Sequence, residues 1–423
     1  MKLKSFKIET YRSCKRTLFP VNDELTTLIG PNGSGKSNIM NAMYLFHQLI
    51  NAKLLPLDQR QRYNTSNFQL VFSIENKTFN FNGKLYYETK QNQDTIHHCF
   101  FRWNFKNFID FPQWFEIPFI YLKDKKIYTK EYNAKKEKFV ETEFDTKLLG
   151  NIDDSAKETI LYLIGETYKF FNNMFFFEAN MFSDPKICPD NLQYGADILL
   201  TEIFEHSYHL NFMDSLIKGY KQKSEEFNRF INVVDKNGIG LIDSFGTMEL
   251  ELPLSLKDLN RSGKDENFIE IIYPQFSINN QYLYLNQLSK GVFRTLALIY
   301  YLLNSNSSLM LIEEPEFCIH HELLSRIIDM IKEHSKEKQI VFSTHSNFVI
   351  GKLKQENLLV LKNHKEDGTS AKPLEKLLSK RELKEFDEFL VEVGNQGDYW
   401  EEFCLDYYDD FDDLKYDDED DNI

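Results

Sequence analysis

The chain has 423 residues, of which 42% are hydrophobic and 27% charged, and its formal net charge is −15. This composition can fill a packed core, which excludes an intrinsically disordered protein. The acidic balance argues against a surface that binds nucleic acid everywhere, although it is compatible with a local basic groove. No segment reaches the roughly 18 uninterrupted apolar residues of a membrane span, so no membrane partner is expected. The five scattered cysteines, without a C-x-x-C pair, predict reduced thiols in a cytoplasmic protein.

Three predicted strands lead into the strongest motif of the chain. Alternating apolar residues indicate strands over 2–10, 17–20 and 25–29. The octapeptide GPNGSGKS at 30–37 follows, with the G-x-x-x-x-G-K-S spacing of a phosphate-binding P-loop. Apolar residues at helical spacing then continue to Ile50. Strand, glycine loop and helix are the structural context that this motif requires.

The chemistry of this loop points to a nucleoside triphosphate with Mg²⁺. Glycines permit backbone conformations in which N–H groups face phosphate oxygens, and the following helix places its positive dipole end beneath them. Lys36 is expected to bind the β- and γ-phosphates, and the Ser37 hydroxyl to ligate Mg²⁺. The residues predicted to bind ATP in this loop are Gly30, Asn32, Gly33, Ser34, Gly35, Lys36, Ser37 and Asn38.

The segment 68–144 is predicted to be an antiparallel β region. Short runs of Phe, Tyr, Ile and Thr alternate there with turn residues such as Asn82-Gly83. Between residues 121 and 138, lysines interleaved with tyrosines fit a solvated hairpin, which we favour, or a nucleic-acid patch. Adjacent residues on a strand point to opposite faces, so His97-His98-Cys99 is not expected to bind a metal.

A helical insertion is expected over 153–234. The helical period is clearest at 155–171 and 195–212, and strand character returns at 268–285. The chain shows no repeat of 20–50 residues and no sustained heptads, so we expect no long coiled-coil arm.

A serine and a glycine stand at the start of the next apolar helix, which is predicted over 293–303. They belong to the segment Ser289-Lys290-Gly291. A serine in this position can simply cap the helix. Alternatively, the free N–H groups and the dipole of the helix start can hold an anion. Both interpretations are open on the local sequence alone.

Two apolar strands then end in titratable side chains. The first, 308–312, runs into Glu313-Glu314, where one carboxylate can hold Mg²⁺ and the other can polarise a water molecule. Because Pro315 follows, an ordinary acidic turn is the alternative. The second strand, 339–344, is followed by His345, which is either a structural histidine or a phosphate contact.

The order and spacing of these motifs resemble the ABC-type ATPase superfamily. More narrowly, the chain is similar to the OLD/AbiL-like group, which includes ATPase subunits of anti-phage systems such as PARIS, Septu and Gabija. The resemblance covers the first 50 residues or so and the segment from about 270 to 360. The segments that carry it are 6–13, 30–38, 288–291, 312–320 and 343–346.

This resemblance implies a role for each motif. Glu313 takes the place of the usual Mg²⁺-side aspartate, Glu314 is the general base, and His345 contacts the γ-phosphate. Ser289 and Gly291 reach the ATP of a partner subunit, so that a head-to-tail dimer completes the active site.

The resemblance implies one further ATP contact, and the chain departs from the family pattern at two positions. Arg12, within the N-terminal motif, is an expected ATP contact. Lys290 stands where transporters carry glycine, and His321 stands where relatives often have proline.

The C-terminal part is expected to add a strand at 358–362 and a helical pair at 374–392. OLD-type nucleases carry a Toprim domain after the ATPase head, and the 78 residues after His345 are too few for one. A nuclease served by this protein is therefore expected on another chain. The segment 399–423 alternates acidic with aromatic residues, which fits a disordered solvated tail or a docking segment that folds on a basic partner.

Taken together, the sequence predicts an α/β fold. An ABC-type ATPase head is expected over 1–398, with a P-loop α/β core, the β-rich segment 68–144 and the helical insertion 153–234, followed by the acidic tail 399–423. The expected function is an ATP- and Mg²⁺-dependent sensor or scaffold of anti-phage defence, a homodimer or larger oligomer that controls a separately encoded nuclease or toxin. The alternatives are a RecF/SMC-like DNA-repair ATPase that binds DNA in an ATP-dependent manner, and an interaction module with ATP as a structural ligand.

Overall fold

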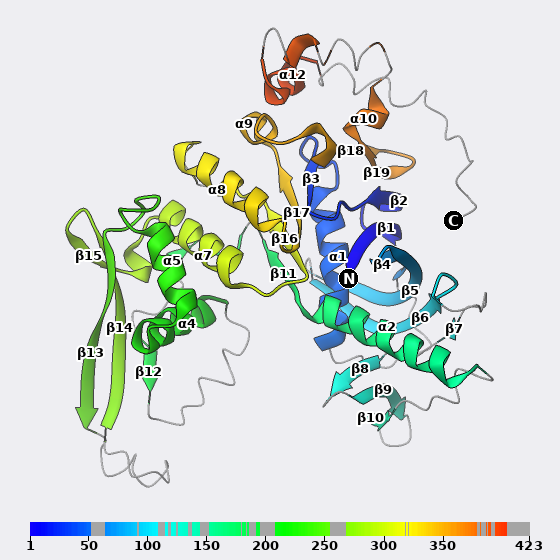
Figure 1. Ribbon diagram of the computed structural model, residues 1–423, viewed down its shortest axis with the longest axis horizontal. Coiled ribbons are helices and arrows are strands. Elements are labelled where there is room, and N and C mark those ends of the chain that lie inside the picture. The colour runs from blue at the N-terminus through cyan, green and yellow to red at the C-terminus, as the bar shows by residue number, and fades with distance from the viewer. Residues whose placement is uncertain are drawn as a thin grey trace. The chain divides into compact units, whose positions relative to one another are not determined.

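The chain folds into two compact units (Figure 1). Unit 1 comprises Met1–Phe176, Asn306–Glu314 and Ser335–Ile423, and unit 2 comprises Phe177–Ser305 and Pro315–His334. The single head predicted over 1–398 spans both units, and its extent stays a prediction. The computed structural model describes residues 1–51, 64–90, 93–108, 115–116, 120–123, 126–133, 138–143, 152–178, 180–182, 184–185, 192–194, 208–253, 268–317, 319, 321–378, 381, 386, 388–390 and 394–403.

A largely parallel sheet forms the centre of unit 1. Its strands follow the order β11 (Met174–Phe177), β16 (Leu309–Glu313), β17 (Gln339–Thr344), β3 (Leu25–Ile29), β18 (Leu358–His364) and β19 (Gly368–Pro373). The pairs β16–β17, β17–β3 and β3–β18 are parallel, and β19 closes the edge in the antiparallel direction. Strands β3 and β17 are buried throughout, which explains their uninterrupted apolar sequences. The α/β class predicted from the sequence is confirmed.

A second, antiparallel sheet in unit 1 confirms the predicted β-rich region. Its order is β2 (Cys14–Pro20), β1 (Lys2–Tyr11), β4 (Asn64–Ile74), β5 (Lys77–Lys90), β6 (Gln93–Asn104) and β7 (Phe115–Glu116). One face packs on α1 (Lys36–Asn51) through aromatic side chains. The Phe46 ring lies 5.9 Å from Phe6, 5.3 Å from Phe68 and 5.0 Å from Phe171, so helix and sheet share one core.

The lysine- and tyrosine-rich stretch forms a small antiparallel sheet. Its strands are β8 (Ile120–Lys123), β9 (Lys126–Asn133) and β10 (Lys138–Glu143). The favoured hairpin is therefore confirmed for the backbone, whereas nucleic-acid binding by its side chains lies outside what the structure describes. The same holds for metal binding by residues 97–99, which belong to β6.

The segment 153–234 contains strands that the sequence did not predict. The helices α2 (Asp154–Asn172), α4 (Tyr208–Gln222) and α5 (Glu225–Val234) are present, and residues 195–207 of the second predicted helix lie outside the described part. Between α2 and α4, however, β11 joins the central sheet and β12 (Leu192–Tyr194) pairs with β14 (Phe268–Ile278). A run as short as Met-Phe-Phe-Phe fits a buried helix turn and a buried strand equally well, and only the neighbouring β16 decides between them.

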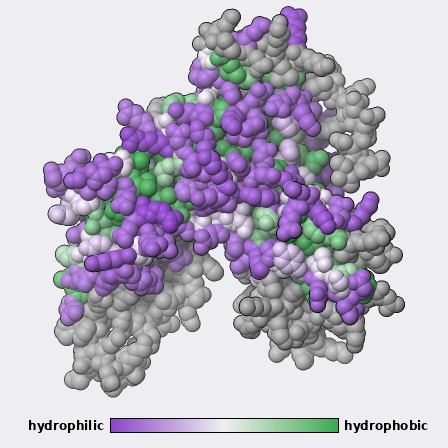
Figure 2. Space-filling model, in the orientation of Figure 1, coloured by the Kyte–Doolittle hydropathy of each residue, from purple (hydrophilic) through white to green (hydrophobic). Residues whose placement is uncertain are grey.

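Unit 2 is built on β14, which pairs with β12, with β13 (Ser244–Pro253) and with β15 (Gln281–Tyr284). The helices α4 and α5 pack on this sheet through Phe245, whose ring lies 5.4 Å from Tyr220, 5.3 Å from Phe227 and 5.0 Å from Phe276. The helices α7 (Lys290–Asn304) and α8 (His321–His334) complete the unit. On the face drawn in Figure 2, hydrophobic residues show among hydrophilic ones over α5 and α7. Among the described residues, no helix has the length and apolar character to span a membrane.

A buried arginine anchors α7 inside unit 2. The Arg294 side chain is fully buried, and its Nη1 donates hydrogen bonds to the carbonyl oxygens of Glu178 (3.1 Å) and Met181 (2.9 Å). The guanidinium also lies over the rings of Phe177, at 4.8 Å, and Phe317, at 5.7 Å. Carbonyl dipoles and ring faces compensate the charge where water is excluded.

The last described helix, α12 (Gln396–Phe403), changes the boundary of the predicted tail. Tyr399 is buried, and its ring lies 4.6 Å from Phe386 and 5.4 Å from Phe389. The Gln396 side chain donates to the carbonyl oxygen of Leu353 at 3.0 Å. Residues 399–403 are therefore part of the folded unit. The reason is that Tyr399, an aromatic residue among acidic ones, packs on the rings of Phe386 and Phe389. Residues 404–423 lie outside the described part.

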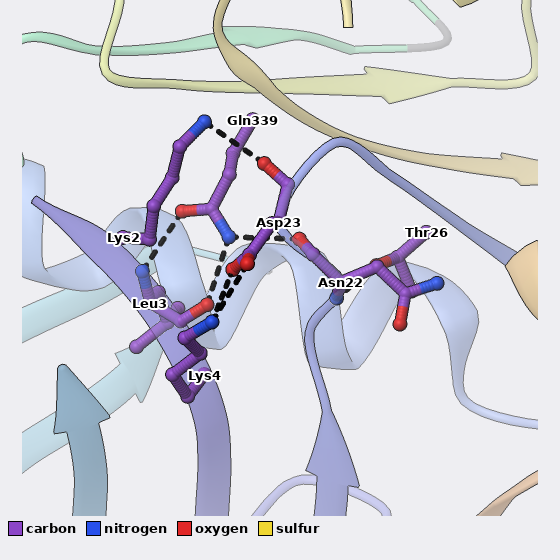
Figure 3. Close-up of polar contacts among 7 residues, drawn as sticks. All are labelled: Lys2, Leu3, Lys4, Asn22, Asp23, Thr26 and Gln339. Atoms are coloured by element: carbon purple, nitrogen blue, oxygen red, sulfur yellow. Dashed lines mark hydrogen bonds and ion pairs between the residues drawn. The ribbon is translucent and has the colours of Figure 1, made fainter. Parts of the chain in front are cut away.

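A single glutamine ties the first strand of the chain to the central sheet (Figure 3). Gln339, at the start of β17, is fully buried. Its Oε1 accepts from the Leu3 N–H at 2.8 Å, and its Nε2 donates to the carbonyl oxygens of Leu3 and Asn22, each at 2.8 Å. The side chain thereby satisfies three backbone groups that have lost contact with water.

We expect Gln339→Leu to lower the free energy of unfolding by about 3 kcal/mol, because leucine leaves these buried backbone groups unpaired. Urea denaturation measures the change. The control is Lys4→Ala, which removes the exposed ion pair with Asp23 beside it (2.6 Å) and should cost less than about 1 kcal/mol. Equal effects of the two substitutions would contradict the role given to Gln339.

Candidate functional site

Three neighbouring parallel strands of unit 1 end at the same edge of the sheet. Glu313 pairs with Ser343 across β16 and β17, and Thr344 pairs with Ile29 across β17 and β3. The residues that follow these strands are Glu314, His345 and Gly30. The carboxyl edge of a parallel sheet is where α/β proteins bind their ligands. The fold therefore gathers three motifs that the sequence separates by about 300 residues.

The loop after β3 has the backbone conformation of a phosphate cradle. Gly30, Gly33 and Gly35 have φ values of +147°, +81° and +105°, a region that side chains rarely adopt. A Cβ atom at Gly30 would also meet the carbonyl oxygen of Leu361, and one at Gly35 would meet the Thr369 side chain. Two of the three glycines are thus required by close packing as well as by their dihedral angles.

The P-loop lysine is folded into its own loop. Lys36 is only 5% exposed, and its Nζ donates to the carbonyl oxygens of Gly30 (2.7 Å) and Pro31 (3.0 Å). These carbonyls hold the ammonium group within the concave side of the loop. Phosphate oxygens are stronger acceptors than peptide carbonyls, so the same ammonium group is placed to bind a polyphosphate.

The residues expected to hold Mg²⁺ provide suitable donors. Ser37 is exposed at the start of α1, and Glu313 is half-buried at the end of β16. A hydroxyl and a carboxylate are hard oxygen ligands, which Mg²⁺ prefers, and it usually keeps several water molecules besides. The donor chemistry therefore fits this ion.

Glu314 has an unusual backbone. Its φ of +45° lies in the left-handed region, which costs a residue other than glycine about 1 kcal/mol or more. Its N–H donates to the carbonyl oxygen of Ser343 at 3.1 Å and to the Ser343 hydroxyl at 3.4 Å. The neighbouring strand β17 thus clamps the turn after β16. Its side chain is 32% exposed, and its Oε1 lies 3.4 Å from Nε2 of His345.

Burial lowers the pKa of His345, and the positive charge of Lys36 lowers it further. At neutral pH the imidazole is therefore uncharged, and its contact with Glu314 is not an ion pair. A neutral imidazole can donate one hydrogen bond while the neighbouring carboxylate keeps its charge. The site thus holds a charged ammonium, a neutral imidazole and a carboxylate at one edge of the sheet.

This pKa shift predicts a pH dependence of stability. The unfolded chain binds a proton at His345 near the ordinary pKa of about 6.5, whereas the folded chain binds it only at lower pH. Stability should therefore fall as the pH drops below about 6.5, and His345→Gln should remove that part of the loss. Urea denaturation at pH 7.5 and 5.5 measures it, with His364→Gln as the control. An unchanged loss in His345→Gln would contradict the lowered pKa.

A second layer of polar side chains supports the P-loop, and no sequence motif predicted it. The Asn38 amide donates to the Ser13 hydroxyl at 2.7 Å, and that hydroxyl lies 2.8 Å from Oγ1 of Thr369. The Thr369 N–H also donates to the carbonyl oxygen of Ser13, and the Thr17 hydroxyl to that of Thr369. The side-chain amide of Asn38, a residue expected to contact ATP, thus donates its hydrogen bond to this network. Hairpins from opposite ends of the chain meet here, so no local pattern could have revealed the contact.

Two other expected ATP contacts lie on the surface near this network. Arg12 is exposed in the tight turn between β1 and β2, with a φ of +49°, directly before Ser13. Asn32 is exposed in the P-loop. Next to it, the carbonyl oxygen of Gly33 accepts a hydrogen bond from the Asn363 side chain at 3.1 Å. Both side chains are thus accessible to solvent, and their contact with ATP stays a prediction.

The candidate signature residues belong to unit 2. Ser289 is exposed and caps α7, with its hydroxyl accepting the Val292 N–H at 3.3 Å. Gly291 is half-buried in the first turn. The capping interpretation is therefore confirmed, and it leaves the exposed first turn of α7 available to an anion. The reach of Ser289 and Gly291 to the ATP of a partner subunit stays a prediction.

Two solved structures and one family model are similar to this chain. The chain is similar to the SMC head domain from Thermotoga maritima, with 15% identity, a TM-score of 0.42, and coverage of 88% of this chain and 99% of that one. It is also similar to an Smc head domain bound to the C-terminal domain of ScpA derived from Pyrococcus furiosus, with 12% identity, a TM-score of 0.41, and coverage of 93% and 99%. No curated protein matches the chain significantly. The model of the AAA ATPase domain family matches residues 1–350, so the chain belongs to the AAA ATPase domain family.

Proposed function

We propose that this protein is an ATP-hydrolysing sensor or scaffold of a bacterial anti-phage system, and that it controls a separately encoded nuclease or toxin. One observation supports the ATPase part above all. The P-loop, Glu314 and His345 follow three adjacent parallel strands at one edge of the sheet, and Glu314 lies 3.4 Å from His345. The defence part is supported by the resemblance of the motifs to the OLD/AbiL-like group.

Each residue of the site has a role in the proposed hydrolysis. Lys36 binds the β- and γ-phosphates, and Ser37 with Glu313 holds Mg²⁺, which neutralises charge on the phosphates when bound. Glu314 accepts a proton from the attacking water molecule, whose oxygen forms a bond to the γ-phosphorus while the bond to the bridging oxygen breaks. His345, uncharged at neutral pH, orients the γ-phosphate by hydrogen bonding. The products are ADP and inorganic phosphate.

Assembly is part of the same proposal. The exposed first turn of α7, with Ser289 and Gly291, provides N–H groups for the ATP held by the P-loop of a second copy. Hydrolysis then depends on a dimer. Because ATP binding controls dimer formation, another chain that contacts the dimer can respond to bound ATP. Turnover is expected to be slow and regulatory.

The test is the composition of the complex formed in the presence of ATP. We would express the Glu314→Gln protein together with the products of its neighbouring genes, purify it with ATP and determine the mass and the chains present. A defined complex with a nuclease or toxin chain supports the defence role. A homodimer that contains no other protein chain and captures DNA contradicts it and favours the DNA-repair alternative.

A further inference from the structure

A polar groove lies on the solvent face of the antiparallel sheet of unit 1, and its described lining contains no P-loop residue. Its volume is about 540 Å³, and the side chains of β1, β4, β5 and β6 line it. The polar residues of this lining include Lys7, Asn67, Gln69, Asn82, Lys84 and Arg102. Residues on the opposite face of the same strands, such as Phe6, Phe81 and Trp103, are buried in the core. Because successive side chains of a strand point to opposite faces, the groove side chains lie on the solvent face.

Strand register arranges these side chains in rows across the sheet. Lys7 pairs with Gln69, Gln69 with Asn82, and Asn82 with Arg102. This row has a cation at each end and two amides between them, over three strand spacings or about 14 Å. A parallel row pairs Asn67 with Lys84. The groove therefore offers anion-binding groups at both ends and hydrogen-bonding groups in its middle.

The charge in the groove is opposite in sign to that of the whole chain. Among the described residues three cations line it, although the chain carries a formal net charge of −15. The one carboxylate among these described lining residues is Glu9, which lies 3.5 Å from Nζ of Lys7 and accepts from the Asn67 amide at 3.3 Å. The described lining thus carries more positive than negative side chains.

An unsatisfied acceptor in the groove indicates that the ligand also carries donors. The side-chain oxygen of Asn82 is buried and has no hydrogen-bond partner among the described residues. A buried polar atom without a partner costs about 1–3 kcal/mol, and a bound ligand with an N–H or O–H group would recover that energy. The ligand should therefore combine negative charge with hydrogen-bond donors.

We propose that this groove binds a single strand of nucleic acid, with phosphates on Lys84 and Arg102 and a sugar hydroxyl or base amino group on Asn82. Such a strand carries both kinds of group, and side-chain amides recognise both donors and acceptors on bases. For its biological meaning this proposal rests on the proposed function. It names the class of ligand that the sensor would bind. The binding itself is independent of ATP.

An acidic peptide is the competing occupant, and the lining disfavours it. The acidic segment of this chain, 404–423, is interleaved with aromatic residues. Peptides of that kind bind through aromatic anchors that need apolar pockets. Among the lining residues that the structure describes, the one large apolar side chain is Phe68, which is itself buried in the core.

The test measures fluorescence anisotropy of labelled 15-mers with the full-length protein in the absence of ATP. The probes are oligo-dT, oligo-rU and a 15-base-pair DNA duplex. Lys84→Ala/Arg102→Ala should weaken single-strand binding about 25-fold at 0.1 M salt, since each lost phosphate contact removes a slope of about 0.7 in log K against log salt. Asn82→Ala should weaken binding without changing that slope. If oligo-rU binds more tightly than oligo-dT, the ligand is RNA, recognised through its 2′-hydroxyl. If oligo-dT binds as tightly as oligo-rU or more tightly, the ligand can be single-stranded DNA.

The control is Lys157→Ala/Lys169→Ala on α2, which removes the same charge from surface ion pairs outside the groove. It should leave binding within about twofold. Equal losses in both double variants, tighter binding of the duplex, or binding of a synthetic 404–423 peptide in place of oligonucleotides would each overturn the proposal. Melting temperatures confirm that each variant is folded. Because ATP turnover is measured separately, failure of this site and failure of the ATPase proposal are distinguishable.

Discussion

Glu314→Gln is expected to reduce kcat for ATP hydrolysis about 10²- to 10⁴-fold, the usual contribution of a general base. Glutamine has nearly the same shape but cannot take the proton of the attacking water. The backbone clamp of residue 314 by Ser343 does not involve its side chain and should persist. ATP affinity should therefore stay within a few-fold of the original, and ATP should hold the variant as a dimer. A phosphate-release assay, titration with a fluorescent ATP analogue and mass photometry measure the three properties.

Glu24→Gln is the matched control, because this exposed glutamate directly precedes β3 and undergoes the same chemical change at the opposite edge of the sheet. It should leave turnover unchanged. Full hydrolysis by Glu314→Gln would refute the general-base assignment. Loss of ATP binding together with turnover would instead make Glu314 a binding residue.

Lys36→Ala is expected to weaken ATP binding about 10²-fold or more, because the ammonium group makes charge-assisted hydrogen bonds to two phosphates. Its location supports a large effect: it is held inside the P-loop by the carbonyl oxygens of Gly30 and Pro31. Isothermal titration with ATP and Mg²⁺ measures the loss.

The same substitution has a second, independent consequence. Removal of the Lys36 charge should raise the pKa of His345 toward its ordinary value, which NMR titration of the imidazole detects. Lys354→Ala is the control, since Lys354 is an exposed lysine whose contact is with Glu356. Retained ATP affinity in Lys36→Ala would remove the support for the nucleotide site. An unchanged histidine pKa would show that the two side chains are not electrostatically coupled.

Together, the two substitutions separate an enzyme from a structural nucleotide site. If ATP only stabilises the fold, Lys36→Ala lowers stability in the presence of ATP, and Glu314→Gln has no effect at all. If the chain hydrolyses ATP, Glu314→Gln binds nucleotide and forms the dimer without turning over.

Much of the candidate site could be predicted from the sequence, because each motif is a local pattern. A strand, a glycine loop and a helix within thirty residues determine their own conformation, as the positive φ values of Gly30, Gly33 and Gly35 show. Buried parallel strands such as β3 and β17 are continuous apolar runs, and the residue that follows such a run stands at the edge of the sheet. The expected positions of Glu314 and His345 followed from that rule.

The sequence was weaker where a segment depends on a distant partner. The strand β11 was expected to be helical, because four apolar residues fit either structure until β16 lies beside them. Residues 399–403 of α12 were expected to belong to the tail, because the burial of Tyr399 requires Phe386 and Phe389.

The sequence by itself determined that this chain has an α/β ATPase architecture and which motifs follow its buried strands, since strand, loop and helix patterns are encoded by neighbouring residues. Only the tertiary structure decided which of those motifs meet. It joined Asn38, Ser13 and Thr369 behind the P-loop, placed His345 beside Glu314, and aligned Lys7, Gln69, Asn82 and Arg102 across four strands. The physical reason is that strand order and register are fixed by burial of the whole core, and no local segment of the chain contains that information.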